Sequence, residues 1–389
     1  MIKTHKIISF MFFWLILLAC LQSEEFAVSI GSISFKWYHI FSLLFIPVLF
    51  GSCGCSLTIP PKIVCFYFLL IFSISLLMIP SYGSGNPLIA YFWGAFMIVT
   101  ICSIGKYVKT DAMISVFQKA AIFFLAMVWI KNFIHKEVFI IFFINPSVHP
   151  SVPTFSQGGV NLEATWVALF GFFFMSKKGY IYLFISSFLS VLYTSRVGMI
   201  LNFLYFCWLT YHLYLKNGIF NFKRILQVSF IVSIIAAFFF TSPLASTILN
   251  RIAESGDAEE AGSRGRFAMW INFPEAFMNN MIGYGAGNAM GAIESVSGMS
   301  FVEVNIHNTY MQNALDFGIL GLLIYVIIVL SFLFKEKKLM FANPFAGVLL
   351  GYIAASLIQF GGSENLLFIF VGFYFVYSRQ KKIETVFGK

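Results

Sequence analysis

The sequence predicts an all-α protein that crosses a membrane about twelve times, and three observations lead to this prediction. Of its 389 residues, 59% are hydrophobic and only 11% are charged, whereas soluble domains are about 45–50% apolar and about 25% charged. The mean hydropathy is +0.86. The apolar residues form continuous runs of roughly 20 residues, the length of a membrane-spanning helix. Together these features exclude a soluble enzyme, a disordered chain, a disulfide scaffold and an alternating outer-membrane barrel.

Each long apolar run is expected to form one spanning helix. The expected spans are 7–21, 38–58, 63–80, 88–105, 112–130, 161–176, 179–195, 197–215, 225–242, 308–334, 344–360 and 364–378. The run 137–145 is too short to cross and is expected to be re-entrant or interfacial. The first run follows Lys3 and Lys6 as a signal peptide would, and 17–20 is similar to a lipoprotein cleavage site. An uncleaved first helix is favoured because so many spans follow it.

The basic residues predict the orientation of the chain. With the N-terminus in the cytoplasm, 17 of the 25 Lys and Arg lie on the cytoplasmic side and Lys119 lies within a span. This asymmetry favours cytoplasmic termini, and it explains the net charge of +9 without a nucleic-acid partner. The seven basic residues on the outer side are Lys36, Lys131, Lys136, Arg196, Arg251, Arg264 and Arg266. They include four of the six Arg but only three of the 19 Lys, a bias that suits phosphate binding because a guanidinium offers a planar fork of donors.

One connection is much longer than the others. The expected parts of the chain are a bundle of about nine helices over 1–242, a large periplasmic loop over 243–306, three more helices over 307–378 and a cytoplasmic tail over 379–389. A long loop in a compact protein is usually functional or disordered. Its aromatic residues indicate that it is ordered against the membrane surface, and 266–273 is typical of an interfacial helix that Pro274 bends or ends.

Within this loop, the glycine-rich segment 283–287 lacks the preceding strand and the spacing of a dinucleotide fingerprint. It is either a flexible turn or backbone that approaches a ligand. The acidic run 257–260 lacks a clear Asp-x-Asp spacing and is expected to be solvated. The six Cys are expected to be small buried hydrophobic residues, since no pair has the spacing of a zinc or redox site. No metal and no cofactor are expected.

His307 and Asn308 end the loop at the start of the tenth span. Asn308 is a good N-cap, so His307 lies just before a helix N-terminus. The positive end of that helix disfavours the imidazolium form, which leaves a neutral ring able to accept a proton, and it favours a nearby phosphate. The alternative is an interfacial His packed beside Tyr310.

Several short motifs in the second half of the chain resemble one family. His307-Asn308-Thr309-Tyr310 precedes Leu-Asp-Phe-Gly-Ile-Leu-Gly at 315–321, and Gly265-Arg266 and Ile-Gly-Tyr-Gly at 282–285 come before it. In their order and sidedness they resemble the O-antigen ligase and O-antigen polymerase superfamily, which has many helices and a large periplasmic loop late in the chain. Thr194-Ser195-Arg196 is similar to that family's Ser-Arg element. The motifs lie between about 190 and 330, and elsewhere only the topology is similar.

That family acts on sugars carried on undecaprenyl pyrophosphate. The resemblance implies that Arg196 and Arg266 hold the pyrophosphate, and that His307 is the base for the attacking hydroxyl or orients it. Fixed guanidinium groups would stabilise the charge that develops on the leaving pyrophosphate, so no metal is needed, and direct displacement would invert the anomeric carbon. Arg264 lies two residues from Arg266, so the two face differently in any regular structure, and Arg264 is given a secondary role. Arg251 is expected to be a surface charge.

Asn308 and Tyr310 are further candidates for substrate contacts. Asp316 stands where the family more often has Glu, and it keeps the charge. It lies about two turns inside a span, where a carboxylate usually has a partner in the bundle. Arg196 is one candidate partner, and structural pairing and catalysis both stay open.

Glu163 and Glu364 lie at outer ends of spans, and both are candidates for lining the same cavity. Arg196 also has an alternative role, because a long basic side chain at a helix end can anchor the helix at the interface.

Three functions compete. The favoured one is polymerisation of undecaprenyl-pyrophosphate-linked oligosaccharide repeats at the inner membrane of a Gram-negative bacterium, with a chain-length regulator as a further partner. The second is an O-antigen ligase that transfers polysaccharide to lipid A–core. The third is a lipid-linked sugar transporter, which should show internal repeats and polar residues at mid-membrane. The short chain and its preference for Phe, Ile and Lys, which is typical of serotype-specific sugar clusters, favour the polymerase.

Overall fold

The computed structural model describes residues 2–30, 33–53, 57–82, 86–144, 152–156, 158–215, 261–301, 305–335 and 343–387. The chain forms two compact units, the first made of 1–122 with 265–389 and the second of 123–264. The expected ninth span at 225–242, Arg251 and the acidic run 257–260 lie outside the described residues.

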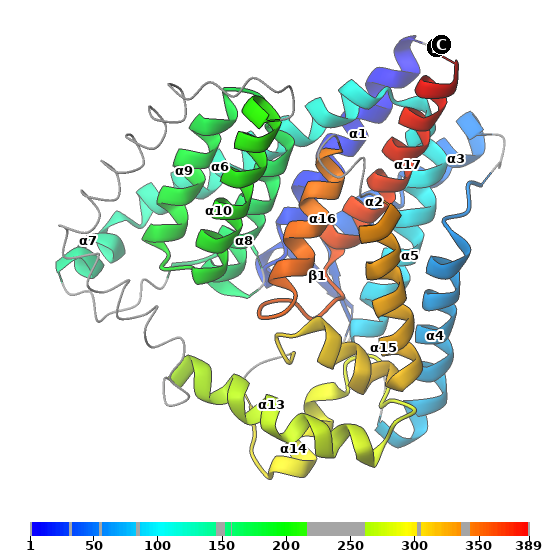
Figure 1. Cartoon of the computed structure of the whole chain (residues 1–389), viewed down its shortest axis with the longest axis vertical. Coiled ribbons are helices and arrows are strands. Elements are labelled where there is room, and N and C mark those ends of the chain that lie inside the picture. Colours follow the sequence, from blue (N-terminus) through cyan, green and yellow to red (C-terminus); the bar gives the residue numbers. More distant parts are fainter. Residues whose placement is uncertain are drawn as a thin grey trace. The chain divides into compact units, whose positions relative to one another are not determined.

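The first unit contains most of the helices (Figure 1). These are α1 (Ile2–Cys20), α2 (Trp37–Ser42), α3 (Phe45–Cys53), α4 (Lys62–Tyr82), α5 (Asn86–Ile104), most of α13 (Ala261–Asn279), α14 (Ala289–Ser297), α15 (Thr309–Lys335), α16 (Pro344–Ala355) and α17 (Asn365–Phe387), with short 3-10 turns at Glu24–Phe26 and Gly105–Tyr107. Helix α6 (Thr110–Ile134) begins in this unit and ends in the second.

The second unit continues from α6 with a smaller set of helices. They are α7 (Lys136–Ile144), α8 (Gly159–Phe170) with a 3-10 turn at Gly171–Phe173, α9 (Gly179–Leu192) and α10 (Arg196–Thr210), which ends in a π-helical turn at Tyr211–Leu215. Helix α10 packs against both α8 and α9.

The prediction of an all-α membrane protein is confirmed in outline. Within the described residues, four helical segments are long and apolar enough to cross a membrane: Lys62–Ile79, Leu88–Tyr107, Thr110–Ile134 and Thr309–Phe334. Shorter apolar helices occupy most of the other expected runs. The number of spans stays a prediction.

Two details differ from the expected helices. The run 38–58 is not one helix, because α2 ends at Ser42 and α3 begins at Phe45. Pro47 has no N–H to donate, so it is accommodated in the first turn of a new helix. In addition, β1 (Ala27–Ile30) and β2 (Ile33–Lys36) pair antiparallel, with Ala27 opposite Lys36.

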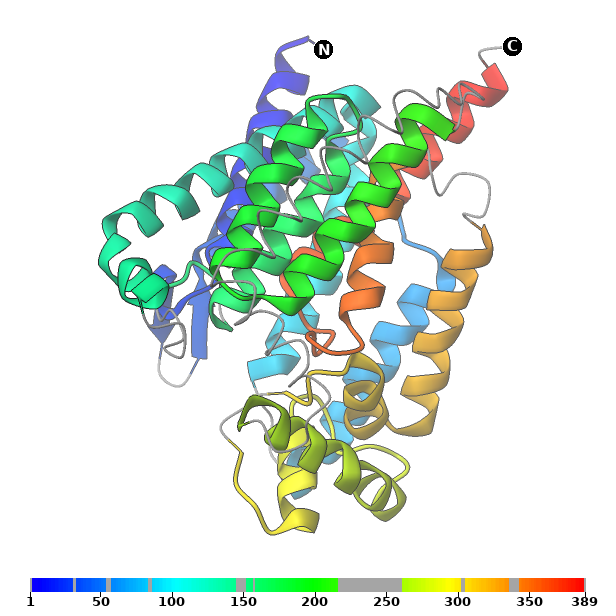
Figure 2. The same cartoon turned by 60° about the vertical axis from the view of Figure 1, so that its left-hand side comes forward.

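Helices α13 and α14 lie across the end of α4 and α15 in both views (Figures 1 and 2). An apolar cluster of buried residues joins them to the start of α15. Its members are Met269, Ala276, Tyr284, Ala289, Met290, Ala292, Ile293, Ile306 and Leu315. The expected helix at 266–273 is part of α13, which continues through Pro274, so of the two expected effects Pro274 does not end the helix. The helix ends at Asn279, where Asn280 donates to the Gly283 carbonyl (2.9 Å) in a tight turn.

Candidate functional site

The start of α15 is capped as the sequence predicts. The Asn308 side-chain oxygen accepts hydrogen bonds from the backbone N–H groups of Tyr310 (3.0 Å) and Met311 (3.1 Å). Its amide nitrogen donates to the Leu357 carbonyl (3.1 Å). Asn308 is therefore committed to holding the helix start, and a substrate contact through it stays a prediction.

His307 is held in an unusual backbone conformation just before this cap. Its φ is 55°, in the left-handed region that few non-glycine residues adopt. Its N–H donates to the Asn305 side-chain oxygen (2.8 Å), and its half-buried ring places Nδ1 3.3 Å from the Gln359 carbonyl oxygen. Because a carbonyl oxygen can only accept, Nδ1 is the donor in this contact, and in a neutral ring Nε2 is then the nitrogen that can accept a proton.

Helix α13 supports the segment that precedes His307. The Trp270 indole N–H donates to the Ile306 carbonyl (3.4 Å). Arg266 is half-buried and lies one helical turn before Trp270, and residues four apart share a face of a helix. Arg266 and His307 therefore belong to neighbouring segments of the same unit. Arg264 lies in the first turn of α13, and its side chain is outside the described part of the chain.

Asp316 holds the start of α14. One carboxylate oxygen accepts from the Ala289 N–H (3.0 Å), and the other accepts from the Gln312 side chain (2.8 Å). Gln312 in turn accepts from the Ile306 N–H (3.1 Å). These contacts give Asp316 a structural role and connect it to the segment before His307. Gln312 was not among the predicted residues, although its position four before Asp316 on one helix could have indicated the pair.

The glycine-rich segment 283–287 packs on a break in α15. At Gly318 the backbone leaves the helical conformation (φ 68°, ψ −167°). The Leu315 and Asp316 carbonyls then accept from the N–H groups of Tyr284 and Gly285, each at 2.8 Å. A Cβ at Gly283 would lie 2.6 Å from the Asp316 carbonyl oxygen. The segment is therefore an ordered turn that needs glycine to reach α15.

Arg196 lies in the second unit, as the first residue of α10. Ser195 caps this helix by accepting from the Gly198 N–H (3.2 Å), and Thr194 before it has a φ of 49°. The Arg196 side chain is half-buried. Its phosphate-binding role and its anchoring role both stay predictions.

Glu163 is completely buried near this turn. It forms an ion pair with Lys131, and it accepts from the Tyr193 hydroxyl (2.8 Å) and from the Phe155 N–H (2.8 Å). Both carboxylate oxygens are thus used within the protein. These contacts favour a structural role for Glu163 over direct contact with a substrate.

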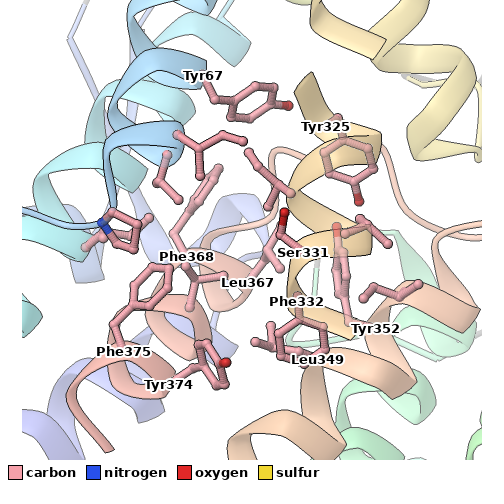
Figure 3. Close-up of a pocket in the computed structure, with 18 of the residues that line it drawn as sticks. Tyr67, Tyr325, Ser331, Phe332, Leu349, Tyr352, Leu367, Phe368, Tyr374 and Phe375 are labelled. Carbon is pink, nitrogen blue, oxygen red and sulfur yellow. The ribbon is translucent and has the colours of Figure 1, made fainter. Parts of the chain in front are cut away.

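An apolar cavity of about 270 Å³ lies between α4, α15, α16 and α17. Its walls are mostly Phe and Tyr rings and aliphatic side chains, as Figure 3 shows. Two of the residues that line the cavity lie at the loop between α16 and α17, residues 356–364. Tyr352 is in the last turn of α16, just before this loop, and Gly362 is in the loop itself. The cavity therefore reaches the loop that contacts His307. Tyr310 lies near it, with its ring centroid 5.3 Å from that of the cavity-lining Tyr325.

Among the side chains that the structure describes, no three His, Cys, Asp or Glu residues come together as a metal site. The acidic run 257–260 is outside those residues, so metal independence stays a prediction.

Comparison with known proteins bears on the predicted family. No curated protein matches this chain. A family model described as O-antigen ligase does match, over residues 181–326. That region contains nearly all of α9, α10, α13, α14 and the first part of α15, and with them Arg196, Arg266 and His307. Over residues 181–326, the resemblance that the motifs predicted to the O-antigen ligase and polymerase superfamily is therefore confirmed.

Proposed function

We propose that this protein is an O-antigen polymerase of the inner membrane. It joins oligosaccharide repeat units carried on undecaprenyl pyrophosphate, on the periplasmic side. The observation that carries this proposal is the contact between His307 Nδ1 and the Gln359 carbonyl, which leaves Nε2 as the ring nitrogen that can accept a proton, within the region that matches the family.

In the proposed reaction, a hydroxyl of one lipid-linked repeat attacks the anomeric carbon of another. His307 Nε2 takes the hydroxyl proton while the bond between the anomeric carbon and the pyrophosphate oxygen breaks. The lipid pyrophosphate leaves with its bonding electrons, a new glycosidic bond forms and the configuration inverts. A positioned base of this kind typically contributes about 10²–10⁴-fold to the rate.

The two arginines stabilise the leaving group. Arg266 lies on the face of α13 that carries Trp270, whose indole binds the segment next to His307. Arg196 lies at a helix N-terminus, where backbone N–H groups also favour an anion. Planar guanidinium groups fixed beside the pyrophosphate stabilise the charge as it develops.

The apolar cavity suits the hydrocarbon chain of such a substrate. Its lining is aromatic and aliphatic, and it shares Gly362 with the loop that contacts His307. A chain lying there would keep the pyrophosphate end of the same lipid close to the base. A chain-length regulator is a proposed protein partner.

We propose that the transfer needs no metal ion. Activity of the purified protein should therefore survive a strong chelator, because the guanidinium groups provide the positive charge. Activity that is lost on chelation and restored by magnesium or manganese would contradict this and would make the acidic run 257–260 a candidate metal site.

The alternative function is the ligase reaction, which the matching family also covers. Both reactions use the same donor, so the product distinguishes them. Deleting a polymerase should leave core bearing at most one repeat, because ligation still works. Deleting a ligase should leave bare core, with long polymer trapped on the carrier lipid.

The corresponding test is His307→Ala in the otherwise unchanged chain. We expect the one-repeat phenotype with normal protein levels, since loss of the base stops transfer. Bare core with accumulated lipid-linked polymer would show that the protein is the ligase. Normal long polymer would rule out the assigned role of His307.

A further inference from the structure

The loop between α16 and α17, residues 356–364, supplies four main-chain acceptors to the start of α15. The donors are the His307 ring, the Asn308 amide, and the N–H and hydroxyl of Thr309. The acceptors are the carbonyl oxygens of Ser356 (2.9 Å), Leu357 (3.1 Å), Gln359 (3.3 Å) and Phe360 (2.9 Å). Because all four contacts use main-chain oxygens, they depend on the path of the loop and not on the side chains of the four acceptor residues.

Glu364 fixes that path at the end of the loop. Its two carboxylate oxygens accept from the N–H groups of Gly361 (2.7 Å) and Gly362 (2.9 Å), and the Tyr352 hydroxyl also donates to it. A carboxylate that accepts several such bonds holds a turn more strongly than a neutral acceptor does. The turn also needs glycine, since Gly362 has a φ of 92° and a Cβ there would lie 2.7 Å from the Thr309 methyl group.

We infer that Glu364 is a positioning residue for His307, acting through the 356–364 loop. By shaping the loop, Glu364 places the Gln359 carbonyl against Nδ1 and so keeps Nε2 as the base. The inference rests on the proposed function, and it extends the site beyond the family-matched region, which ends at residue 326. A second hydrogen-bonding group behind a His commonly sets which ring nitrogen carries the proton.

The direct test is the tautomer of His307, which needs no substrate. Full-length protein labelled with ¹⁵N-histidine in lipid nanodiscs should show His307 protonated at Nδ1, and the signal is assigned by its loss in His307→Ala. In Glu364→Gln, one oxygen becomes an amide that cannot accept, so we expect a mixture of Nδ1-H and Nε2-H forms. Gly362→Ala should produce the same mixture without removing the carboxylate. An Nδ1-H signal that is unchanged in both variants would overturn the inference.

The activity arm asks whether this positioning serves the transfer. We expect Glu364→Gln to lower kcat about tenfold with KM unchanged, a smaller loss than the 10²–10⁴-fold typical of removing a general base. The matched controls are Glu384→Gln, on an exposed side chain of α17 that pairs with Lys381, and Gly291→Ala, where a Cβ meets nothing within 4 Å. Both should leave kcat and the tautomer unchanged.

The two arms separate the inference from the proposed function. A shifted tautomer with unchanged kcat in Glu364→Gln would overturn the positioning role in catalysis. Full activity of His307→Ala would instead rule out the role of His307 as the base in the proposed function, and the tautomer of Glu364→Gln would still decide whether Glu364 controls the ring.

Discussion

The starts of α10 and α15 can be compared residue by residue. In each, a residue other than glycine with a positive φ precedes a polar N-cap: Thr194 (49°) precedes Ser195, and His307 (55°) precedes Asn308. In the described part of the chain, Thr194 and His307 are the two non-glycine residues with positive φ. Such residues cost on the order of 1–3 kcal/mol each and persist where the surroundings enforce them, often at functional sites.

The two starts place their functional side chain on opposite sides of the cap. Arg196 follows Ser195 and is the first residue of its helix, whereas His307 comes before Asn308. A positive side chain is unfavourable at the positive end of a helix, but an anion bound there interacts well with both the helix end and the guanidinium. The same helix end favours a neutral His. The two positions therefore suit a phosphate-binding group and a base, respectively.

A glutamate supports each start, but the partners of the two glutamates differ. Glu163 accepts from the hydroxyl of Tyr193, next to Thr194, and also pairs with the Lys131 ammonium. Glu364 accepts from the Tyr352 hydroxyl and from backbone N–H groups. Charge at the first start is thus balanced inside the protein, whereas the second is held through neutral donors. The two should respond differently when a carboxylate is neutralised.

The largest expected effect tests the chemistry assigned to the arginines. Arg266→Lys and Arg196→Lys keep the charge but lose the planar fork of donors. We expect each to lower transfer activity by roughly 10²–10³-fold, as when one donor to a developing charge is removed. Polymer length and initial rate in membranes with equal protein levels provide the measurement.

Arg251→Lys is the matched control, because Arg251 is expected to be a surface charge, and it should have near-normal activity. If only Arg196→Lys makes near-normal polymer, Arg196 is an interfacial anchor, and the start of α10 does not have the phosphate-binding role that the comparison assigns to it. Near-normal polymer in Arg266→Lys would remove the phosphate-binding role altogether.

The second prediction compares the two glutamates by stability. Glu163→Gln leaves the Lys131 ammonium buried without its charge partner, which typically costs about 3–5 kcal/mol in the free energy of unfolding. Glu364→Gln loses one hydrogen bond from a neutral backbone N–H to a half-buried carboxylate, which typically costs about 1.5–3 kcal/mol. Thermal unfolding midpoints of the purified variants should show the larger drop for Glu163→Gln.

A double variant identifies the cause. Adding Lys131→Met to Glu163→Gln removes the remaining charge and should recover part of the lost stability, because close residues couple in such a cycle. Equal midpoints for Glu163→Gln and Glu364→Gln, with no recovery in the double variant, would show that the ion pair does not distinguish the two starts.

The positions of the helices could be predicted because apolar runs fix where a membrane helix can form. The run 63–80 became Lys62–Tyr82, and 112–130 became Thr110–Ile134. The short strands were missed, although Val28 and Ile30 alternate with Ser29 as a strand would. The expected span 225–242 lies outside the described residues, and the number of spans stays a prediction.

Within the candidate site, the sequence could predict only the contacts between residues that are close together in the chain. Asn308 as an N-cap follows from its position before an apolar run, and the capping bonds confirm it. The contact from His307 to Gln359 spans 52 residues, and it uses a main-chain oxygen that no residue type reveals. The contact of Asp316 with Ala289 also arises from tertiary packing. That contact does not involve Arg196, which the sequence suggested as one candidate partner of Asp316.

The smallest expected effect concerns the two caps. Replacing an N-cap by Ala typically costs about 1 kcal/mol, so Ser195→Ala should be a mild change. Asn308→Ala should cost somewhat more, because Asn308 also donates to the Leu357 carbonyl and that bond helps to hold the 356–364 loop. Asn308→Asp separates the two contributions, since it keeps the capping oxygen but cannot donate to Leu357. We expect Asn308→Asp to keep the stability of the helix start yet to lower kcat as Glu364→Gln does. If Asn308→Asp has normal kcat while Asn308→Ala does not, the cap alone positions His307, and the two helix starts are held in the same way after all.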